Sequence, residues 1–399
     1  LMYADRYAGI ANAYKKWSGE MQGLVINDAI NKKKKFEIDL IQSLNADATK
    51  QNKCKQILAD FKKVYVEYAP LSKQVDYYSE CLMGIDAIRY ITNYHALFAE
   101  LKKKQAGKEN KFDQMYADLK KTIPFRNFNK DTDKKLCIAM LKEYALNIDK
   151  ESRPVYLDSL YMAYNNDTEK ITEFLYNNSS FIDNTKAAAM LSDFEKSYSL
   201  YERDPFYKLA LAINTYYQKG VFPQYNYDEL QLLELQKEYM QMQKDNVKTK
   251  KFYPDANGTL RVAYGKVDDY KPKDGVTYLH YTTIDGMVDK NSTGNPDYEV
   301  MPRLIELYNK KDYGMYADKN GKLRVSFIAS NHTTGGNSGS PVLNAKGELI
   351  GTNYDRNWEG TMSDVMYDVN RCRNIVLDVR FTLWIVDKYA GAGYLLNEM

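Results

Sequence analysis

The chain has 399 residues, of which 44% are hydrophobic and 27% are charged, and its formal net charge is +3. This length is enough for two or more domains, and the near-neutral balance gives no bulk reason to expect a nucleic-acid or membrane partner. No stretch approaches the roughly 20 apolar residues of a membrane-spanning helix. The two lysine runs, 32–35 and 102–104, fall in helical stretches and are interpreted as solvated helix faces.

Residues 1 to 248 are predicted to form an all-α domain of about eight to ten helices. Apolar residues recur there at spacings of three and four, as at Ile57, Phe61 and Val64. Clusters of turn-forming residues separate the helical stretches. Because a helical pattern already begins near Tyr3, we expect the chain to start inside a larger protein, so the lack of a signal peptide is uninformative.

From residue 249 onward the pattern changes to period-two alternation, which predicts strands after a loop at 253–258. The expected strands are Thr259–Gly265, Gly275–Thr282, Arg324–Ala329, Pro341–Leu343, Gly347–Thr352 and Asn374–Leu377. Asp378 is expected to cap a final helix, Val379–Tyr389. The predicted fold class is therefore α+β, with a helical domain (1–248) followed by part of a β-barrel that ends in a helix (249–399).

The cysteines and histidines give no sign of a metal site. None of the four cysteines lies at Cys-Xaa-Xaa-Cys spacing, and the three histidines are too few and too distant to complete a zinc site. We expect buried free thiols and no cofactor. The cysteines are Cys54, Cys81, Cys137 and Cys372.

The most informative stretch is Gly336-Asn337-Ser338-Gly339-Ser340-Pro341, between two strand-like runs. It is typical of the nucleophile loop of a chymotrypsin-type serine peptidase, because glycines permit the sharp bend that exposes a serine hydroxyl. Ser338 is the predicted nucleophile. The backbone N–H groups of Gly336 and Ser338 are the predicted oxyanion hole. The alternative is an ordinary Gly/Ser turn between strands.

Several motifs together resemble one family of bacterial exopeptidases, the dipeptidyl peptidases 7 and 11. They are Thr333 to Val342, Gly347-Glu348-Leu349-Ile350-Gly351, Tyr354 to Glu359, Asp378-Val379-Arg380, Tyr253 to Asn257 and Tyr281-Thr282-Thr283. The resemblance is strong from about residue 250 and weaker, though collinear, before it. It implies a helical domain inserted into a chymotrypsin-like double barrel, and release of dipeptides from free peptide N-termini.

Two residues after the nucleophile loop are expected to bind the substrate. Arg356 lies where the following strand walls the S1 pocket, and a guanidinium there would pair with a carboxylate, so it predicts Asp or Glu at P1. Arginine at this position also resembles the Asp/Glu-cleaving type 11. The alternative is a structural arginine paired with Asp364 or Asp355. By resemblance, Asp355 holds the α-amino group of the substrate; the alternative is a turn-capping aspartate.

The chain departs from the family in two respects. Within Asn12 to Gly19, Lys16 stands where the family's helical domain usually supplies an asparagine that helps hold the substrate amine. A lysine would repel that amine. In addition, the resemblance places the base and its orienting aspartate before Leu1, so the isolated chain is expected to be nearly inactive.

The three histidines are weighed as substitutes for the missing base. His95 lies in a helical stretch and His280 in a strand, and both are interpreted as structural. His332 precedes Ser338 by six residues, and it is expected to order the loop rather than to act as a base.

The leading hypothesis is thus a serine dipeptidyl peptidase that acts on peptides with a free N-terminus. The alternatives are a glutamyl endopeptidase and a non-catalytic peptide-binding relative. No nucleic acid, metal or membrane span is expected, and a homodimer is left open. Periplasm or cell surface is the location that the resemblance implies.

Overall fold

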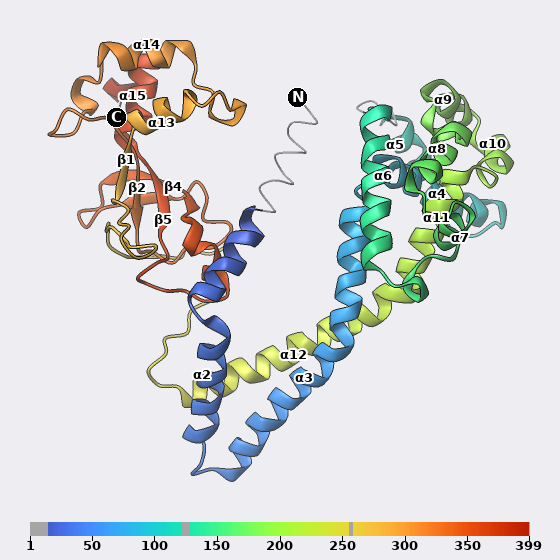
Figure 1. The fold of residues 1–399 in the computed structure, drawn as a ribbon, viewed down its shortest axis with the longest axis horizontal. Coiled ribbons are helices and arrows are strands. Elements are labelled where there is room, and N and C mark those ends of the chain that lie inside the picture. Colours follow the sequence, from blue (N-terminus) through green and yellow to red (C-terminus); the bar gives the residue numbers. More distant parts are fainter. Residues whose placement is uncertain (1–14, 122–127, 255–257, 399) are drawn as a thin grey trace. The chain divides into compact units, whose positions relative to one another are not determined.

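The structure is a computed structural model, and it describes residues 15–121, 128–254 and 258–398. The chain divides into two compact units, Ile41–Lys248 and a unit that joins the residues up to Leu40 with Thr249–Met399 (Figure 1). One junction lies between Lys248 and Thr249, and the other lies between Leu40 and Ile41. The described residues up to Leu40 thus group with the C-terminal residues, and the division into 1–248 and 249–399 stays a prediction.

Contacts of the N-terminal helix explain this grouping. Residues 15–26 are helical, and a Cβ added at Gly23 would lie 3.0 Å from Met362 Cγ, so the helix packs closely against that methionine. The Nδ2 of buried Asn27 donates to Met362 Sδ at 3.1 Å. Trp358 Nε1 donates to Gln22 Oε1 at 3.3 Å. These contacts join segments more than 300 residues apart, which local sequence patterns do not report.

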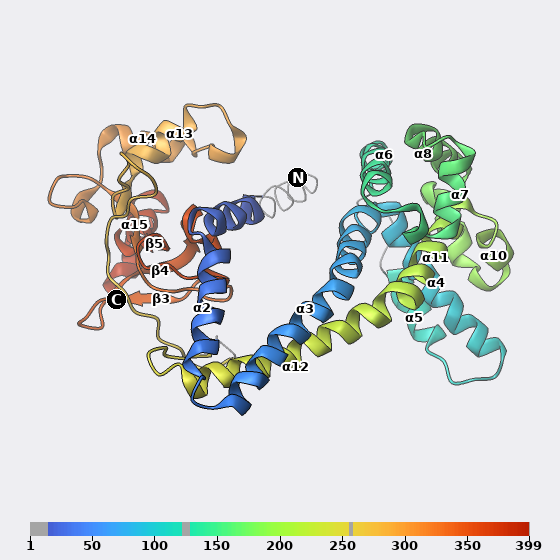
Figure 2. The same ribbon diagram turned by 60° about the horizontal axis from the view of Figure 1, so that its bottom comes forward.

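The unit Ile41–Lys248 is built of helices (Figures 1 and 2). Two long helices, α3 (Ala48–Tyr77) and α12 (Phe222–Asn246), pack side by side. Asp47 begins α3, because its carboxylate accepts from Lys50 N. The shorter helices of this unit are α4 (Asp86–Gln105), α5 (Phe112–Lys121), α6 (Lys130–Asn147), α7 (Val155–Ala163), α8 (Thr168–Asn178), α9 (Asn184–Ser192), α10 (Phe194–Tyr201) and α11 (Pro205–Tyr216), with 3₁₀ turns η2 (Lys150–Ser152) and η3 (Ser180–Ile182).

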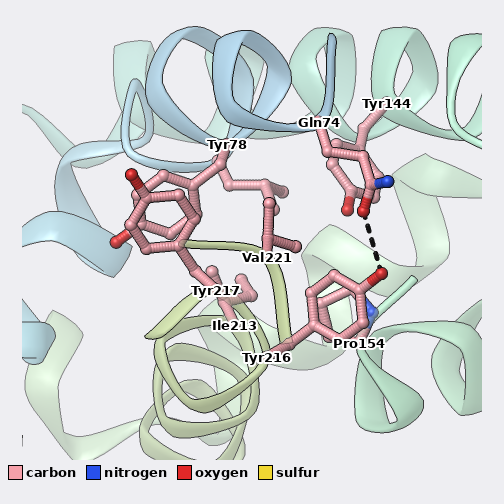
Figure 3. Close-up of a pocket in the computed structure, with 9 residues that line it drawn as sticks. Gln74, Tyr78, Tyr144, Pro154, Ile213, Tyr216, Tyr217 and Val221 are labelled. Carbon is pink, nitrogen blue, oxygen red and sulfur yellow. Dashed lines mark hydrogen bonds between the residues drawn. The ribbon is translucent and has the colours of Figure 1, made fainter. Parts of the chain in front are cut away.

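A π-turn adjoins each of the two long helices, and the two turns face one another. η1 (Tyr78–Leu82) follows α3 directly, and η4 (Tyr217–Val221) precedes α12. The rings of Tyr78 and Tyr217 stack with centroids 3.8 Å apart and planes 2° apart. Figure 3 shows this stack beside a small pocket, where Tyr216 Oη donates to Gln74 Oε1 at 3.0 Å. The π-turns were not predicted, since one extra residue leaves no clear periodicity signal.

A buried carboxylate organises the start of α4. Asp133 of α6 is fully buried, and it accepts from Asp86 N at 2.7 Å, Ala87 N at 3.0 Å and Tyr176 Oη at 2.6 Å. The residue that precedes α4, Ile85, makes no side-chain cap. Asp133 therefore satisfies two of the orphan amides of α4 from a different helix.

The other unit contains a five-stranded antiparallel sheet with the order β1-β2-β5-β4-β3. The strands are β1 (Tyr281–Thr283), β2 (Arg324–Ala329), β3 (Pro341–Leu343), β4 (Leu349–Arg356) and β5 (Asn374–Asp378). The sheet and the helices together confirm the α+β class in its general form. β2 and β3 match their expected bounds. β4 begins two residues later and ends four residues later than predicted, and β5 ends one residue later.

One expected strand was wrong. Residues 259–265 form no strand, and the alternating Leu260, Val262 and Tyr264 are 88%, 80% and 85% exposed. Within the described ranges no ladder partner pairs with this segment, so its alternation has no sheet face to cover. The expected strand at 275–282 is also shorter, because its regular pairing begins only at Tyr281.

Helices cover part of this unit. Its remaining elements are α2 (Ala29–Ser43, which continues across the junction), α13 (Ile284–Asn291), α14 (Pro302–Lys310), α15 (Val379–Trp384), the π-turn η8 (Ile385–Tyr389), and the 3₁₀ turns η5 (Pro296–Tyr298), η6 (Gly314–Tyr316), η7 (Trp358–Asp364) and η9 (Gly393–Glu398). Asp378 caps α15 as expected, accepting from Arg380 N at 2.9 Å. Trp384, fully buried, anchors α15 in a core with Phe381 and Leu323. Across the described helices, none combines the length and apolarity that a bilayer crossing requires.

Candidate functional site

The loop that carries Ser338 connects β2 with β3 and has the backbone that the sequence predicted. Gly336 and Gly339 adopt φ of +97° and +84°, the left-handed region that favours glycine. Asn337 closes the loop, because its Oδ1 accepts from Thr334 N at 2.8 Å. Gly339 N donates to Asn353 O at 2.8 Å, which fastens the loop to β4.

Ser338 is exposed at the tip of this loop. Its Oγ makes one long contact, donating to Tyr354 O at 3.4 Å. Among the described residues no acceptor pairs with the backbone N–H groups of Gly336 and Ser338. The two amides are therefore available to an incoming oxygen, as an oxyanion hole requires; their role stays a prediction.

Both ring nitrogens of His332 already have hydrogen-bond partners, which argues against a role as the base. Nδ1 lies 2.9 Å from Tyr253 Oη, and Nε2 lies 3.2 Å from Ser363 O. A carbonyl oxygen only accepts, so Nε2 carries the hydrogen and Nδ1 accepts from the tyrosine. The ring thus ties the start of the nucleophile loop to η7, which agrees with the expected ordering role.

The other two histidines are engaged elsewhere. His95 Nδ1 lies 3.3 Å from Asn214 Nδ2 in the helical unit, and burial lowers its pKa. His280 Nδ1 lies 2.8 Å from Asp269 Oδ1. Over the described parts of the chain, no histidine or carboxylate contacts Ser338 Oγ.

Sequence reasoning missed the pair of Asp269 with His280. Asp269 also accepts from the backbone N of His280 at 2.6 Å, and these two hydrogen bonds lower the pKa of its carboxyl. A signal was present, because Asp274-Gly275 is a strong hairpin dipeptide. Pairing around that turn brings residues 269 and 280 next to each other, as the bridge of Tyr270 with Tyr278 shows.

Asp355 and Arg356 end β4, just after an irregularity in its pairing. Asn353 pairs with Val376 while Asp355 pairs with Ile375, so Tyr354 is an extra residue in the strand. Such a bulge changes the direction in which the following side chains point. Asp355 is exposed, and its Oδ1 accepts from Arg356 N at 2.7 Å.

The guanidinium of Arg356 is held by η7 and by the loop before Ser338. Its Nη1 and Nη2 donate to the two carboxylate oxygens of Asp364 at 2.7 and 3.0 Å. Nη1 also donates to Ser363 Oγ at 2.6 Å and lies 3.4 Å from Thr333 O. The first of the two structural alternatives, a pair with Asp364, is therefore present. It does not decide whether Arg356 also binds substrate, and that role stays a prediction.

Lys16 is exposed in the N-terminal helix, and its neighbours 12–14 lie outside the described residues. Its charge is one of the causes that lower the pKa of Asp364, after the larger effect of Arg356. All four cysteines are buried thiols, as expected. Burial raises the pKa of Cys81 to about 11 and of Cys137 to about 12. In the described ranges no group of three or more His, Cys, Asp or Glu side chains could hold a metal ion.

Comparison with known proteins decides the family. The profile of peptidase S46 matches residues 1–399. The chain belongs to the peptidase S46 family. An Asp/Glu-specific dipeptidyl-peptidase of Flavobacterium psychrophilum is 40% identical over 100% of this chain. A dipeptidyl-peptidase 7 of Phocaeicola vulgatus is 29% identical over the same share. The expected resemblance is thereby confirmed.

A solved structure of this family agrees with the fold. Porphyromonas endodontalis DPP11 in complex with the dipeptide Arg-Glu matches 100% of this chain with a TM-score of 0.83 and 30% identity. The same enzyme in an alternate conformation matches with a TM-score of 0.68. The chain spans 55% of the length of the Flavobacterium relative and 56% of the first DPP11 structure.

Proposed function

We propose that the full protein is a serine dipeptidyl peptidase that releases dipeptides from free peptide N-termini and prefers Asp or Glu at P1. The observation that carries this proposal is the match of the whole chain to Asp/Glu-specific relatives, combined with Arg356 at the end of β4. Arginine at position 356 is the residue by which this chain resembles the Asp/Glu-cleaving type.

The exposed loop supplies the proposed nucleophile. Ser338 Oγ attacks the carbonyl carbon of the second peptide bond, and its proton passes to a base that, with its aspartate, lies outside this chain. The oxyanion is stabilised by the N–H groups of Gly336 and Ser338. Collapse of the tetrahedral intermediate releases the shortened peptide, whose new amino group takes the proton from the base. Water then hydrolyses the acyl-enzyme, which frees the dipeptide and restores the Ser338 hydroxyl.

Substrate selection is proposed to use both ends of the dipeptide. Asp355 binds the α-ammonium group, so that only peptides with a free N-terminus are placed for cleavage after two residues. Arg356 binds the P1 carboxylate. Blocked peptides that were cleaved equally well would favour the glutamyl endopeptidase alternative instead.

The finer fold and setting belong to the same proposal. We propose that the five-stranded sheet forms part of a chymotrypsin-like double barrel into which the helical unit is inserted. A periplasmic or surface location and a homodimer are further expectations from the resemblance.

The test is Arg356→Gly in the full-length protein. We expect kcat/KM on Xaa-Glu amides to fall at least about tenfold, since a charge-assisted bidentate pair is lost, and hydrolysis of Xaa-Leu amides to rise. Labelling of Ser338 by a fluorophosphonate should persist. An unchanged P1 preference would show that Arg356 is structural, and absent labelling in the wild-type protein would favour the non-catalytic alternative.

A further inference from the structure

Two buried asparagines lie on neighbouring strands next to the loop that carries Ser338. Asn353 belongs to β4 and Asn374 begins β5, and they are 5% and 2% exposed. In each strand the asparagine shares the buried face with a small or apolar residue, Gly351 in β4 and Val376 in β5. A buried polar side chain costs stability unless it is hydrogen-bonded, so two amides at such positions need an explanation.

The two side chains form an amide relay that ends on the nucleophile loop. Asn374 Nδ2 donates to Asn353 Oδ1 at 3.0 Å, and Asn353 Nδ2 donates to the carbonyl oxygen of Asn337 at 3.1 Å. The carbonyl fixes the direction of both bonds, because a carbonyl oxygen can only accept. Asn353 therefore presents its NH₂ group to the loop and its Oδ1 to Asn374, which must donate.

The acceptor at the end of the amide relay belongs to the peptide that carries the N–H of Ser338. This peptide is trans, so its carbonyl and its N–H point in opposite directions. The bond from Asn353 holds the Asn337 carbonyl toward β4, and the Ser338 N–H consequently points away from that strand, where no described residue accepts from it. An oxyanion hole needs its N–H groups to be both free and fixed in direction.

The loop is also attached to β4 by bonds that do not involve the Asn353 side chain. Gly339 N donates to Asn353 O at 2.8 Å, and Asn353 N donates to Ser340 O at 2.9 Å. Asn337 O accepts in addition from Ser340 N at 3.1 Å, which closes a turn within the loop. A side-chain variant at position 353 should therefore leave the loop attached, while the Asn337–Ser338 peptide loses the donor that the strand supplies.

We propose that Asn353 and Asn374 are positioning residues for the peptidase reaction, which hold the Asn337–Ser338 peptide so that the Ser338 N–H points to the substrate oxyanion. This inference rests on the proposed function, in which Ser338 is the nucleophile. Asn353 acts on the peptide directly, and Asn374 acts only through Asn353. The buried Oδ1 of Asn374 has no partner among the described residues. Because such an atom costs stability, it agrees with a side chain that is kept for the bond it donates.

The experiment uses the full-length protein with Asn353→Leu, Asn374→Leu and the double variant. Leucine keeps the branched shape of asparagine but neither donates nor accepts, and the double variant removes both amides at once, which is nearly neutral for stability. The double variant thus gives a result even where a single variant folds poorly. The control is Asn344→Leu in the turn between β3 and β4, because the side-chain hydrogen bonds of Asn344 stay within that turn.

Three quantities are measured: kcat and KM on an Xaa-Glu amide, the second-order rate of Ser338 labelling by a fluorophosphonate, and the midpoint of thermal unfolding. Complete loss of an oxyanion-hole donor lowers kcat about 10²- to 10³-fold. Because the Ser338 N–H remains and only its direction is less well fixed, Asn353→Leu should lower kcat and the labelling rate about tenfold, with KM nearly unchanged.

The other variants separate the two asparagines. Asn374→Leu should lower kcat and the labelling rate about threefold. The double variant should match Asn353→Leu, since the two residues act in series. The control should change only the midpoint of unfolding.

Three results would overturn the inference alone. The first is a folded Asn353→Leu protein, or a folded double variant, with the kcat and labelling rate of the wild type. The second is a rise in KM at unchanged kcat, which would place the effect on substrate binding. The third is a double variant in which the effects of the single variants multiply, because Asn374 would then not act through Asn353. Absence of Ser338 labelling in the wild-type protein would instead refute the proposed nucleophile, and the inference with it.

Discussion

The buried carboxylate of Asp133 should be one of the most sensitive positions for the stability of the helical unit. Replacement by alanine removes the acceptor of three hydrogen bonds and leaves two backbone amides of α4 and the Tyr176 hydroxyl without it. Each unsatisfied buried donor costs about 1–3 kcal/mol. Loss of a buried charge offsets part of this cost, because burial raises the pKa of Asp133. We expect a net loss of about 3–5 kcal/mol.

The tryptophans make the two units separable in one urea titration. All three, Trp17, Trp358 and Trp384, lie outside Ile41–Lys248. Tryptophan fluorescence therefore reports the sheet-containing unit, while circular dichroism at 222 nm is dominated by the helical unit. Asp133→Ala should lower the midpoint seen by circular dichroism, and the fluorescence transition should move less.

Asp131→Ala is the matched control for this prediction. Asp131 is an exposed acid in the first turn of the same helix, so its loss should cost only about 0.5 kcal/mol. Tyr176→Phe, which removes one of the three donors, should fall between the two. If Asp133→Ala costs no more than Asp131→Ala, the carboxylate does not stabilise the start of α4, and the reasoning fails.

Two further predictions concern the other unit. Gly351→Ala should destabilise this unit by at least about 2 kcal/mol in the fluorescence transition, because the new Cβ would lie 2.3 Å from Leu377 O. The control is Gly286→Ala, which should be neutral or stabilising because a Cβ there would have no atom within 4 Å. Equal effects of the two variants would contradict the close strand packing at Gly351. His332→Gln in the full-length protein should raise KM but leave the pH dependence of kcat unchanged, since both ring nitrogens already have partners. Loss of the acidic limb of that profile, where activity rises as the base loses its proton, would make His332 the base after all.

The sequence predicted best those elements whose signals are local. β2 follows from the alternation of apolar and polar residues. The cap of α15 follows from a single side chain, Asp378, which accepts a hydrogen bond from the backbone N–H of Arg380 in the helix it begins. The positive φ of Gly336 and Gly339 follows from the motif itself. Each of these signals is complete within a few residues, so no knowledge of tertiary structure is needed to interpret it.

Features that depend on distant partners could not be predicted in this way. Residues 259–265 alternate like a strand but have no ladder partner in the described chain. From the sequence, Arg356 could bind the substrate or pair with Asp364 or Asp355. Only the fold shows that η7 brings the carboxylate of Asp364 to the guanidinium. The hydrogen bond of Asn27 with Met362 joins residues 335 positions apart in sequence.

The facing π-turns limit how the helical unit can change in length. A π-turn contains one residue more than the α-turn it replaces, and one residue of helix corresponds to about 100° of rotation. Deleting a residue from η1 alone would therefore turn α3 about its axis by about 100° and remove Cys54, Ile57 and Val64 from their buried face. A matching deletion in η4 would turn α12 as well. Relatives that lack one π-turn should thus lack both, or carry a compensating insertion in the same helix pair.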